Sequence, residues 1–349
     1  MRGGHQGDCT LTDPVSFRPQ RPPFDKVLVT GGAGFIGSRA VRLLADLGCH
    51  AVALDNGYVG LPLPEASERV TPVHADIRDR DGMKAVLAEH RPDAVLHLAA
   101  VHHIPTCERE PHLAMDVNIM GTQSLLEAME AAGCRNLVMA SSGAVYRWDE
   151  GPLTEADTGT GATDVYSITK LTNEYQAGGW ADRSGSRAHM VRLFNTIGSG
   201  DPNGHLIPDI LQQIAAGDDQ PVIRLGNTAP RRDYIYVDDV AAGFVAVLAH
   251  VLEGEARDTF NLSTGRELNV GGLVELMGEI MGKQVRIETD PSRFRKIDRL
   301  QQLGDPSKLT ARTGWQPAWT TRDALVAIMR DLGYATGGQT GGGSSAQAA

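Results

Sequence analysis

A tyrosine and a lysine four residues apart could move a proton to or from an alcohol group. Tyr166 and Lys170 lie in VYSITKLTNEYQAGGWA, a predicted helix, and their spacing places both side chains on one face. A tyrosine phenol has a pKa of about 10, so it is a weak base unless a nearby positive charge stabilises the phenolate. The alternative interpretation is an ordinary helix face with a lysine that extends along it to solvent.

A serine completes the set. Ser142 falls near the carboxyl end of NLVMASSGAVY, a predicted strand, and its hydroxyl could hydrogen-bond to the same substrate oxygen as the tyrosine. These three side chains suit the removal of a proton from an alcohol while a hydride leaves the same carbon. Such chemistry requires a hydride acceptor, which the protein must bind next to them.

A glycine-rich turn near the N-terminus predicts where that acceptor binds. Gly31, Gly34 and Gly37 follow the apolar strand VLV and precede the amphipathic stretch SRAVRLLADLG. The first glycine permits the tight turn, the second lets the backbone approach a phosphate, and the third lets the helix pack on the strand. The free N–H groups of the helix N-terminus favour an anion. We therefore predict a dinucleotide site; the alternative is a flexible turn.

The carboxyl ends of the next strands predict the rest of that site. Asp55 ends the second strand, about 20 residues beyond the glycines, where the adenosine ribose is usually held. No arginine follows it directly to accept a 2′-phosphate, which favours NAD over NADP. The alternative interpretation of Asp55 is a helix-capping or turn residue. Asp76 and Ile77 close the third strand and could face the adenine edge, and HLAA ends the fourth strand with small residues beside the pyrophosphate.

The alternation of strands and helices predicts an α/β fold with a doubly wound parallel sheet of the Rossmann type. From about residue 196 glycine and proline become frequent and helices shorten, which indicates a smaller C-terminal substrate-binding unit. We expect the first unit to comprise residues 25–195 and 233–262, and the second to comprise 196–232 and 263–335. Residues 1–24 are expected to form a disordered extension and 336–349 a flexible tail.

Composition excludes several classes of partner. The chain has 349 residues and a formal net charge of −10, which argues against nucleic acid and anionic membranes. No apolar run is long enough to span a membrane, and 241–252 reads as a buried helix. The four cysteines show no C-x-x-C spacing, so we expect a protein of the reducing cytoplasm. His97, His102 and His103 lack supporting ligand spacing, and no metal is expected.

Several motifs occur together in a fixed order: GGAGFIG, LDN, ADIRD, HLAA, SSGAVY, YSITK, RLFNTIG and RRDYIYVDD. In this respect the chain, from about Val27 to Trp315, resembles the extended short-chain dehydrogenase/reductase superfamily, in its NAD-dependent nucleotide-sugar epimerase/dehydratase branch. The resemblance implies a catalytic triad of Ser142, Tyr166 and Lys170, with Asn118 beside the lysine and the nicotinamide. The motifs and the resemblance together assign to NAD the residues Gly31, Gly34, Phe35, Ile36, Gly37, Asp55, Asn56, Asp76, Ile77, Leu98, Ala99, Ala100, Asn118, Tyr166 and Lys170.

The resemblance also implies a nucleotide-sugar site. Asn195 in RLFN and Arg232 before Asp233 match residues that meet the sugar diphosphate, and Arg295 resembles a second arginine on the nucleotide side. The alternative for each arginine is a surface salt bridge. Leu206 is placed in the base or ribose pocket by position alone. The substrate residues expected are Ser142, Tyr166, Asn195, Leu206, Arg232 and Arg295.

The departures from the family pattern narrow the reaction. Dehydratases of this family carry an acidic pair directly after the catalytic hydroxyl residue, where this chain has Gly143 and Ala144. The sequence therefore favours C4 epimerisation of a nucleotide-activated sugar through a 4-keto intermediate. A 4,6-dehydratase or another oxidation-based modification, and a non-catalytic NAD-binding scaffold, remain the alternatives. The resemblance further implies a homodimer paired through helices near 112–132 and 165–180. Arg147-Trp148 replaces a usual glycine at the pocket mouth.

Overall fold

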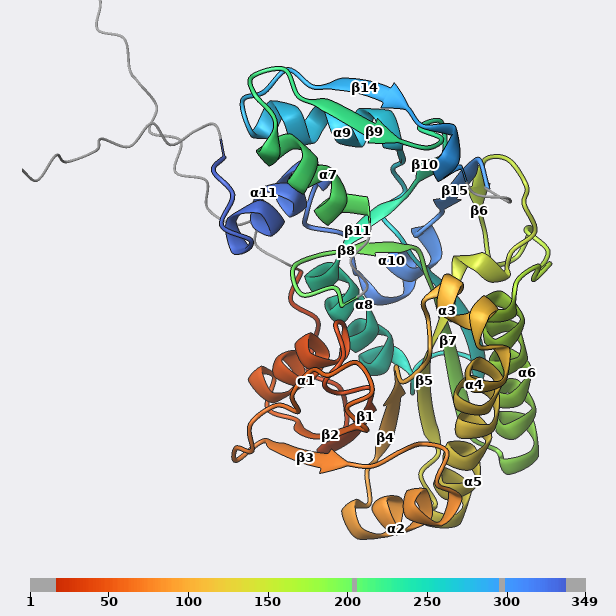
Figure 1. Ribbon diagram of the computed structural model, residues 1–349. Coiled ribbons are helices and arrows are strands. Elements are labelled where there is room, and N and C mark those ends of the chain that lie inside the picture. Colours follow the sequence, from red (N-terminus) through yellow and green to blue (C-terminus); the bar gives the residue numbers. More distant parts are fainter. Residues whose placement is uncertain (1–16, 203–205, 295–298, 337–349) are drawn as a thin grey trace, which may run out of the picture.

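The computed structural model describes residues 17–202, 206–294 and 299–336. Its centre is a parallel sheet with strand order β12-β7-β5-β4-β1-β2-β3 (Figure 1). The chain moves outward from β1 in both directions, so β1 and β4 flank the point where the strand order reverses. Ligands of such sheets bind at the carboxyl ends of the strands at this point. The strands are β1 Lys26–Thr30, β2 His50–Asp55, β3 Val70–His74, β4 Ala94–His97, β5 Asn136–Ser142, β7 Arg187–Leu193 and β12 Arg257–Leu262.

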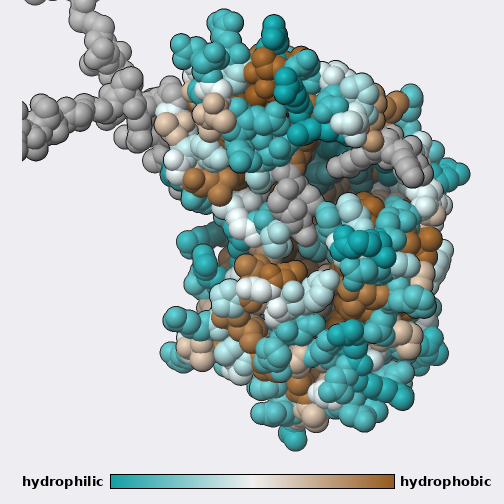
Figure 2. Space-filling model, viewed as in Figure 1, coloured by the Kyte–Doolittle hydropathy of each residue, from teal (hydrophilic) through white to brown (hydrophobic). Residues whose placement is uncertain are grey.

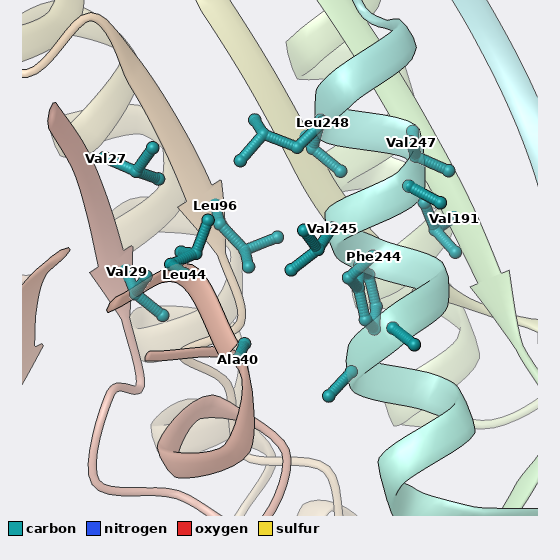
Figure 3. Close-up of a cluster of buried hydrophobic side chains, with 14 of the residues drawn as sticks. Val27, Val29, Ala40, Leu44, Leu96, Val191, Phe244, Val245, Val247 and Leu248 are labelled. Carbon is teal, nitrogen blue, oxygen red and sulfur yellow. The ribbon is translucent and has the colours of Figure 1, made fainter. Parts of the chain in front are cut away.

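Helices cover both faces of this sheet. On one face α1 and α8 pack against the strands (Figure 3), and on the other lie α2, α5 and α6. Successive residues of β1 alternate between the two faces: Val27 and Val29 join the α8 cluster, whereas Leu28 joins the α5 cluster. All three are fully buried, which explains the uninterrupted apolar run. The helices are α1 Gly37–Asp46, α2 Arg80–His90, α3 Ile104–Arg109, α4 Pro111–Met115, α5 Thr122–Ala132, α6 Val165–Ser184 and α8 Val237–His250.

A second unit lies above the carboxyl ends of the sheet in Figure 1. Its core is a separate cluster built from α7 (Leu206–Ala216), α9 (Val270–Ile280) and α11 (Thr321–Asp331). Strand β9 (Val222–Leu225) pairs with β14 (Arg286–Thr289), and β8 (Asn195–Ile197) pairs with β11 (Tyr234–Tyr236). A four-stranded sheet has the order β13-β10-β15-β6. Its strands are β6 Pro152–Leu153, β10 Arg231–Arg232, β13 Leu268–Asn269 and β15 Gln301–Gly304.

Three short helical segments and one helix complete the described elements. The π-helical segment η1 (Asp116–Gly121) precedes α5, so the single long helix expected there is interrupted. The predicted fifth strand stops at Ser142, where the 3₁₀ turn η2 (Gly143–Val145) begins. The third strand ends at His74, before the predicted Asp76 and Ile77. The remaining elements are η3 Pro291–Arg293 and α10 Ser307–Thr313.

Two stretches that the sequence placed elsewhere pack on the first unit. Phe24, expected in a disordered extension, is 5% exposed, and Phe17 packs against the same core cluster. The folded part of the chain therefore includes residues before 25, which the sequence did not predict. Leu309 and Trp315, expected in the second unit, lie in that cluster as well. The indole Nε1 of Trp315 donates to the carbonyl of Asp239 on α8 at 3.1 Å.

The surface contrasts with these cores. The face in Figure 2 is mostly hydrophilic, with hydrophobic residues in scattered groups, as is usual for a folded protein. Within the described ranges, no helix combines the length and the hydropathy that a membrane span requires.

Two leucines of the same stretch test the importance of the α8 core. Leu248 is fully buried among strands and α1 (Figure 3), whereas Leu252, one turn further on, is 44% exposed. We predict that Leu248→Ala lowers the free energy of unfolding by about 2–5 kcal/mol, because it removes buried methyl groups and leaves a cavity. The matched control Leu252→Ala should change it by about 0.5 kcal/mol or less. Urea denaturation measures both; equal effects would contradict the described packing.

Candidate active site

The glycine-rich turn leaves no room for side chains. Gly31 has a φ of +71°, and a Cβ there would lie 2.8 Å from the backbone nitrogen of Ala99. A Cβ on Gly37 would lie 1.9 Å from the carbonyl oxygen of Gly31. No described side chain caps the N-terminus of α1, although the N–H groups of Ser38 and Ala40 already donate to the carbonyls of Gly34 and Ile36. This close-packed, uncapped turn fits a dinucleotide pyrophosphate.

Acidic side chains follow the turn along the sheet edge. Asp55 is 8% exposed; one carboxylate oxygen accepts from the N–H of Ala33 in the turn at 3.2 Å and the other from Gly57 at 2.8 Å. Asn56 donates to Asp76 at 3.0 Å. Hydrogen bonds from Arg78, whose Nη2 lies 2.7 Å from the Asp76 carboxylate, hold the pKa of Asp76 well below its usual range. These contacts hold both side chains in place beside the cradle, and they keep Asp76 in its charged form.

The fourth strand is held beside the cradle by a threonine and a histidine. Thr30 Oγ1 accepts from the N–H groups of Leu98 and Ala99, and lies 2.7 Å from Nδ1 of His97. The other ring nitrogen of His97 lies 2.9 Å from Thr122 Oγ1. Burial lowers the pKa of His97 to about 3, so the ring is neutral and serves packing. Across the described residues, no cluster of three or more His, Cys, Asp or Glu could hold a metal.

Helix α6 presents Tyr166, Lys170 and Glu174 at successive turns of one face. A capping box starts the helix: the carboxylate of Asp164 accepts from the N–H of Ser167 at 2.9 Å. Lys170 is 4% exposed, and its Nζ donates to the carbonyl of Ala140 on β5 at 2.9 Å. Burial lowers the pKa of Lys170 to about 8, so its ammonium is still the main form at neutral pH.

Glu174 fixes the same helix to the strands with a buried ion pair. Its carboxylate accepts two hydrogen bonds from Arg192 on β7, at 2.9 and 2.7 Å, and a third from Ser141 Oγ at 2.5 Å. Both charged side chains are 8% exposed. The guanidinium also lies 4.5 Å from the ring centre of Tyr146. Both nitrogens of Arg192 that face Glu174 therefore bind its carboxylate.

Ser142 and Tyr166 meet at the end of β5. Ser142 is 8% exposed, and its Oγ accepts from the N–H of Ala144 at 3.1 Å. Burial raises the pKa of Tyr166 above its usual value, while hydrogen bonding with Ser142 acts in the opposite direction. We expected the ammonium of Lys170 to lower this pKa. In the protein alone the loss of water around the phenolate has the larger effect.

Asn118 lies in η1, a π-helical segment of the kind that often marks functional sites. Its side-chain nitrogen donates to Val101 O and to Thr169 Oγ1, both at 2.9 Å, and its side-chain oxygen accepts from Val101 N at 2.8 Å. The backbone carbonyl of Asn118 accepts from Asn173 of α6 at 2.7 Å. The amide side chain therefore joins the fourth-strand loop to α6, next to Lys170.

The predicted substrate residues come from neighbouring strands. Asn195 is exposed at the start of β8 and is paired with Tyr234 of β11. Arg232 is half-buried in β10, and its Nη1 donates to the carbonyl of Arg231 at 3.0 Å. Leu206 begins α7 and packs against the second core. Arg295 lies outside the described residues.

Two buried charged residues were not singled out from the sequence. Asp233 is fully buried and accepts from the N–H groups of Thr264 and Gly265 at 2.8 and 2.9 Å. Burial raises its pKa to about 6. Asp233 follows Arg232 in the RRDYIYVDD motif, which could have identified it. Arg299, 8% exposed in the segment before β15, had no such signal.

Neighbouring side chains crowd Gly143, the position after Ser142. A Cβ on Gly143 would lie 3.0 Å from the side-chain nitrogen of Gln302 and 3.1 Å from the ring of Phe194. A carboxylate side chain at this position would require both neighbours to move. The turn accommodates glycine because the second unit packs directly against it.

A pocket of about 640 Å³ lies elsewhere, with Glu155, Asp258 and Lys308 in its lining but not the predicted triad. Its charged groups bind protein atoms: Lys308 contacts the carboxylate of Asp258, and Glu155 accepts from Asn261 N at 2.6 Å. These described contacts give it no distinct ligand chemistry, so the candidate site remains at the sheet edge.

The buried lysine gives a prediction about stability. Because the pKa of Lys170 is lower in the folded chain, the unfolded chain binds more protons between pH 8 and 10.5, and stability rises with pH across that window. We predict that any stability advantage of Lys170→Met over the unsubstituted protein shrinks as pH rises through this window. Urea denaturation at several pH values checks this; a constant difference would show that Lys170 is not buried as a cation.

Known proteins share this architecture. The NAD dependent epimerase/dehydratase family model matches residues 27–263. UDP-glucose 4-epimerase of Bacillus subtilis is 35% identical over 320 residues, covering 83% of this chain and 91% of the relative. GDP-6-deoxy-D-mannose reductase of Pseudomonas aeruginosa is 29% identical, covering 88% and 96%.

A solved structure agrees. UDP-glucose 4-epimerase from Brucella ovis in complex with NAD aligns with a TM-score of 0.78 at 27% identity, covering 89% of this chain and 99% of that one. The resemblance drawn from the motifs and the α/β fold expected from the sequence are therefore both confirmed. With the matching family model and the order of elements in agreement, the chain belongs to the NAD dependent epimerase/dehydratase family.

Proposed function

We propose that this protein is an NAD-dependent epimerase that inverts C4 of a nucleotide-activated sugar. The observation that carries the proposal is the meeting of Ser142 and Tyr166 beside a buried Lys170, next to the glycine cradle and without an acidic residue at Gly143. The names of the relatives support a nucleotide sugar as the substrate class.

The cradle and the sheet edge would hold NAD. The N–H groups around Gly34 and Gly37 would face the pyrophosphate, and Asp55 would accept hydrogen bonds from the adenosine ribose. When bound in its oxidised form, NAD supplies a hydride acceptor at C4 of the sugar and a positive charge near the tyrosine. No cationic side chain follows Asp55 directly in the sequence, which favours NAD over its phosphorylated form.

The protein's own residues would handle the proton. The phenol oxygen of Tyr166 takes the proton from the sugar O4, and Ser142 Oγ holds O4 by a hydrogen bond. The ammonium of Lys170 stabilises the phenolate that starts the step. A 4-keto sugar results, and Tyr166 returns the proton to O4 when the opposite face of C4 has been reduced. Arg232 and Asn195 keep the nucleotide end bound meanwhile, so the keto sugar is not lost.

The closed turn argues against the dehydratase alternative. Loss of water from C5 and C6 requires an acid and a base near those carbons, and the chain has Gly143 and Ala144 in the family's positions for them. A side chain at Gly143 would also have to displace Gln302 and Phe194, which would lie 3.0 and 3.1 Å from its Cβ. An epimerase needs no such pair. A non-catalytic scaffold would not require a buried lysine, because burial of its ammonium weakens the fold.

Product analysis tests the proposal. The protein is incubated with UDP- and GDP-hexoses without added reductant, and products are identified by mass spectrometry and NMR. We predict a product of unchanged mass with inverted C4, and a kcat about 10²–10⁴ lower for Tyr166→Phe with NAD binding retained. Loss of one water would establish the dehydratase. No turnover on any sugar, or full activity of Tyr166→Phe, would contradict the proposal.

We also propose a cytoplasmic homodimer paired through α4, η1 and α6. These elements expose large apolar side chains: Met115 is 41%, Met120 55%, Ile168 43% and Tyr175 70% exposed. A row of this kind on neighbouring helices is typical of an interface between copies.

Light scattering tests the dimer. The unsubstituted protein at micromolar concentration should have twice the chain mass, and Met120→Glu/Ile168→Glu should have the chain mass because it buries charges in the interface. The matched control Leu252→Glu changes an exposed leucine at the end of α8 and should leave the dimer intact. A monomeric unsubstituted protein would contradict the proposal.

A further inference from the structure

Arg299 is a buried cation between the two units. It enters from the segment before β15, is 8% exposed, and donates from Nη2 to the carbonyl of Arg147 at 2.7 Å and from Nη1 to the carbonyl of Gly143 at 3.3 Å. Both acceptors are backbone atoms of the first unit. Its Nε is buried without a hydrogen-bond partner, and no ion pair joins it to a carboxylate in the part of the chain that is described.

The burial of Arg299 lowers the stability of the folded protein. A charged group that loses its water without an opposite charge destabilises the folded state. Burial, together with the nearby charge of Arg232, lowers the pKa of Arg299 to about 10, while the charge of Asp149 acts in the opposite direction. The guanidinium still carries its charge at neutral pH. The hydrogen bonds to the carbonyls of Gly143 and Arg147 must offset this loss of stability.

Those carbonyls flank the turn that orients Ser142. Gly143 is the first residue of η2, and Arg147 lies two residues beyond its last. Within this turn the N–H of Ala144 donates to Ser142 Oγ at 3.1 Å, and the N–H of Tyr146 donates to the carbonyl of Gly143 at 3.4 Å. The N–H of Ala144 occupies one lone pair of the Ser142 hydroxyl oxygen. The conformation of the turn therefore sets the direction of the other lone pair and of the O–H bond.

Arg147 takes part in the same arrangement. Its side chain covers Gly159 and Gly161 of the following loop, where added Cβ atoms would lie 3.0 and 2.7 Å from it. Its backbone N–H donates to the carbonyl of Gly159 at 2.9 Å, while its own carbonyl accepts from Arg299. The loop and the turn are thus tied to one arginine of the second unit.

We propose that Arg299 is a positioning residue for Ser142: by holding the carbonyls of Gly143 and Arg147, it couples the docking of the second unit to the orientation of the Ser142 hydroxyl. The inference rests on the proposed function only in giving Ser142 a part in the reaction. The same strand pair carries Arg232, since β10 and β15 are neighbours with Arg232 opposite Gln302. Substrate held at Arg232 would therefore meet a serine already set by the same unit.

A double-mutant cycle tests this coupling. Arg299→Met, Ser142→Ala and the double variant are compared, with Arg322→Met, an exposed arginine of α11, as the matched control. Methionine fills similar volume without a charge, so the variant should fold. We expect Arg299→Met to lower kcat about tenfold with little change in KM, and to cause no further loss in the Ser142→Ala background. Equal losses in both backgrounds would overturn the proposal.

A second measurement does not depend on turnover. Hydrogen–deuterium exchange of the peptide covering residues 141–147 reports whether the Ala144 amide stays bonded to Ser142. We expect faster exchange in Arg299→Met and no change in Arg322→Met. Unchanged exchange in Arg299→Met would overturn the inference even in an active enzyme. An unsubstituted protein without turnover on any nucleotide sugar contradicts the proposed function instead, and the exchange result then still decides whether Arg299 holds the turn.

Discussion

The attachment of α6 to β5 determines the geometry of the candidate site. Lys170 binds the carbonyl of Ala140, and Glu174, one turn later, binds the hydroxyl of Ser141. Two successive helical turns thus contact two neighbouring strand residues, and Tyr166, one turn earlier on α6, meets Ser142 at the end of the strand. Arg192 prevents a slip of this register, because any shift would leave a buried carboxylate without its partner.

The site retains groups that weaken the fold. Lys170 is buried with a carbonyl as its described polar contact, Arg299 is buried beside another arginine, and Asp233 is fully buried with a raised pKa. Each would be replaced by an apolar residue if stability alone mattered. Their stability costs are offset by apolar cores on both faces of the sheet. The glycine turn is likewise explained by ligand binding, because it excludes side chains where phosphate must approach.

The sequence predicted those features whose cause is local. The apolar run of β1, the glycine spacing and the pair Tyr166 and Lys170 each depend on residues near one another in the chain, and the structure has the strand, the turn and the helix where they were expected. Features set by distant contacts were missed. Phe24 is buried by packing that no local pattern reveals, and Arg299 meets Gly143 across 156 positions. The raised pKa of Tyr166 likewise depends on burial, which spacing does not report.

In the proposed reaction, C4 of the sugar is oxidised and then reduced within one site, and isotope retention at C4 distinguishes this course from others. A nucleotide sugar carrying deuterium at C4 is converted without added reductant, and the product is examined by NMR. We predict that deuterium stays at C4 of the inverted sugar, with none released to water, because the keto sugar remains bound between the two transfers. Inversion with loss of deuterium to solvent, or its appearance at another carbon, would contradict the proposed reaction.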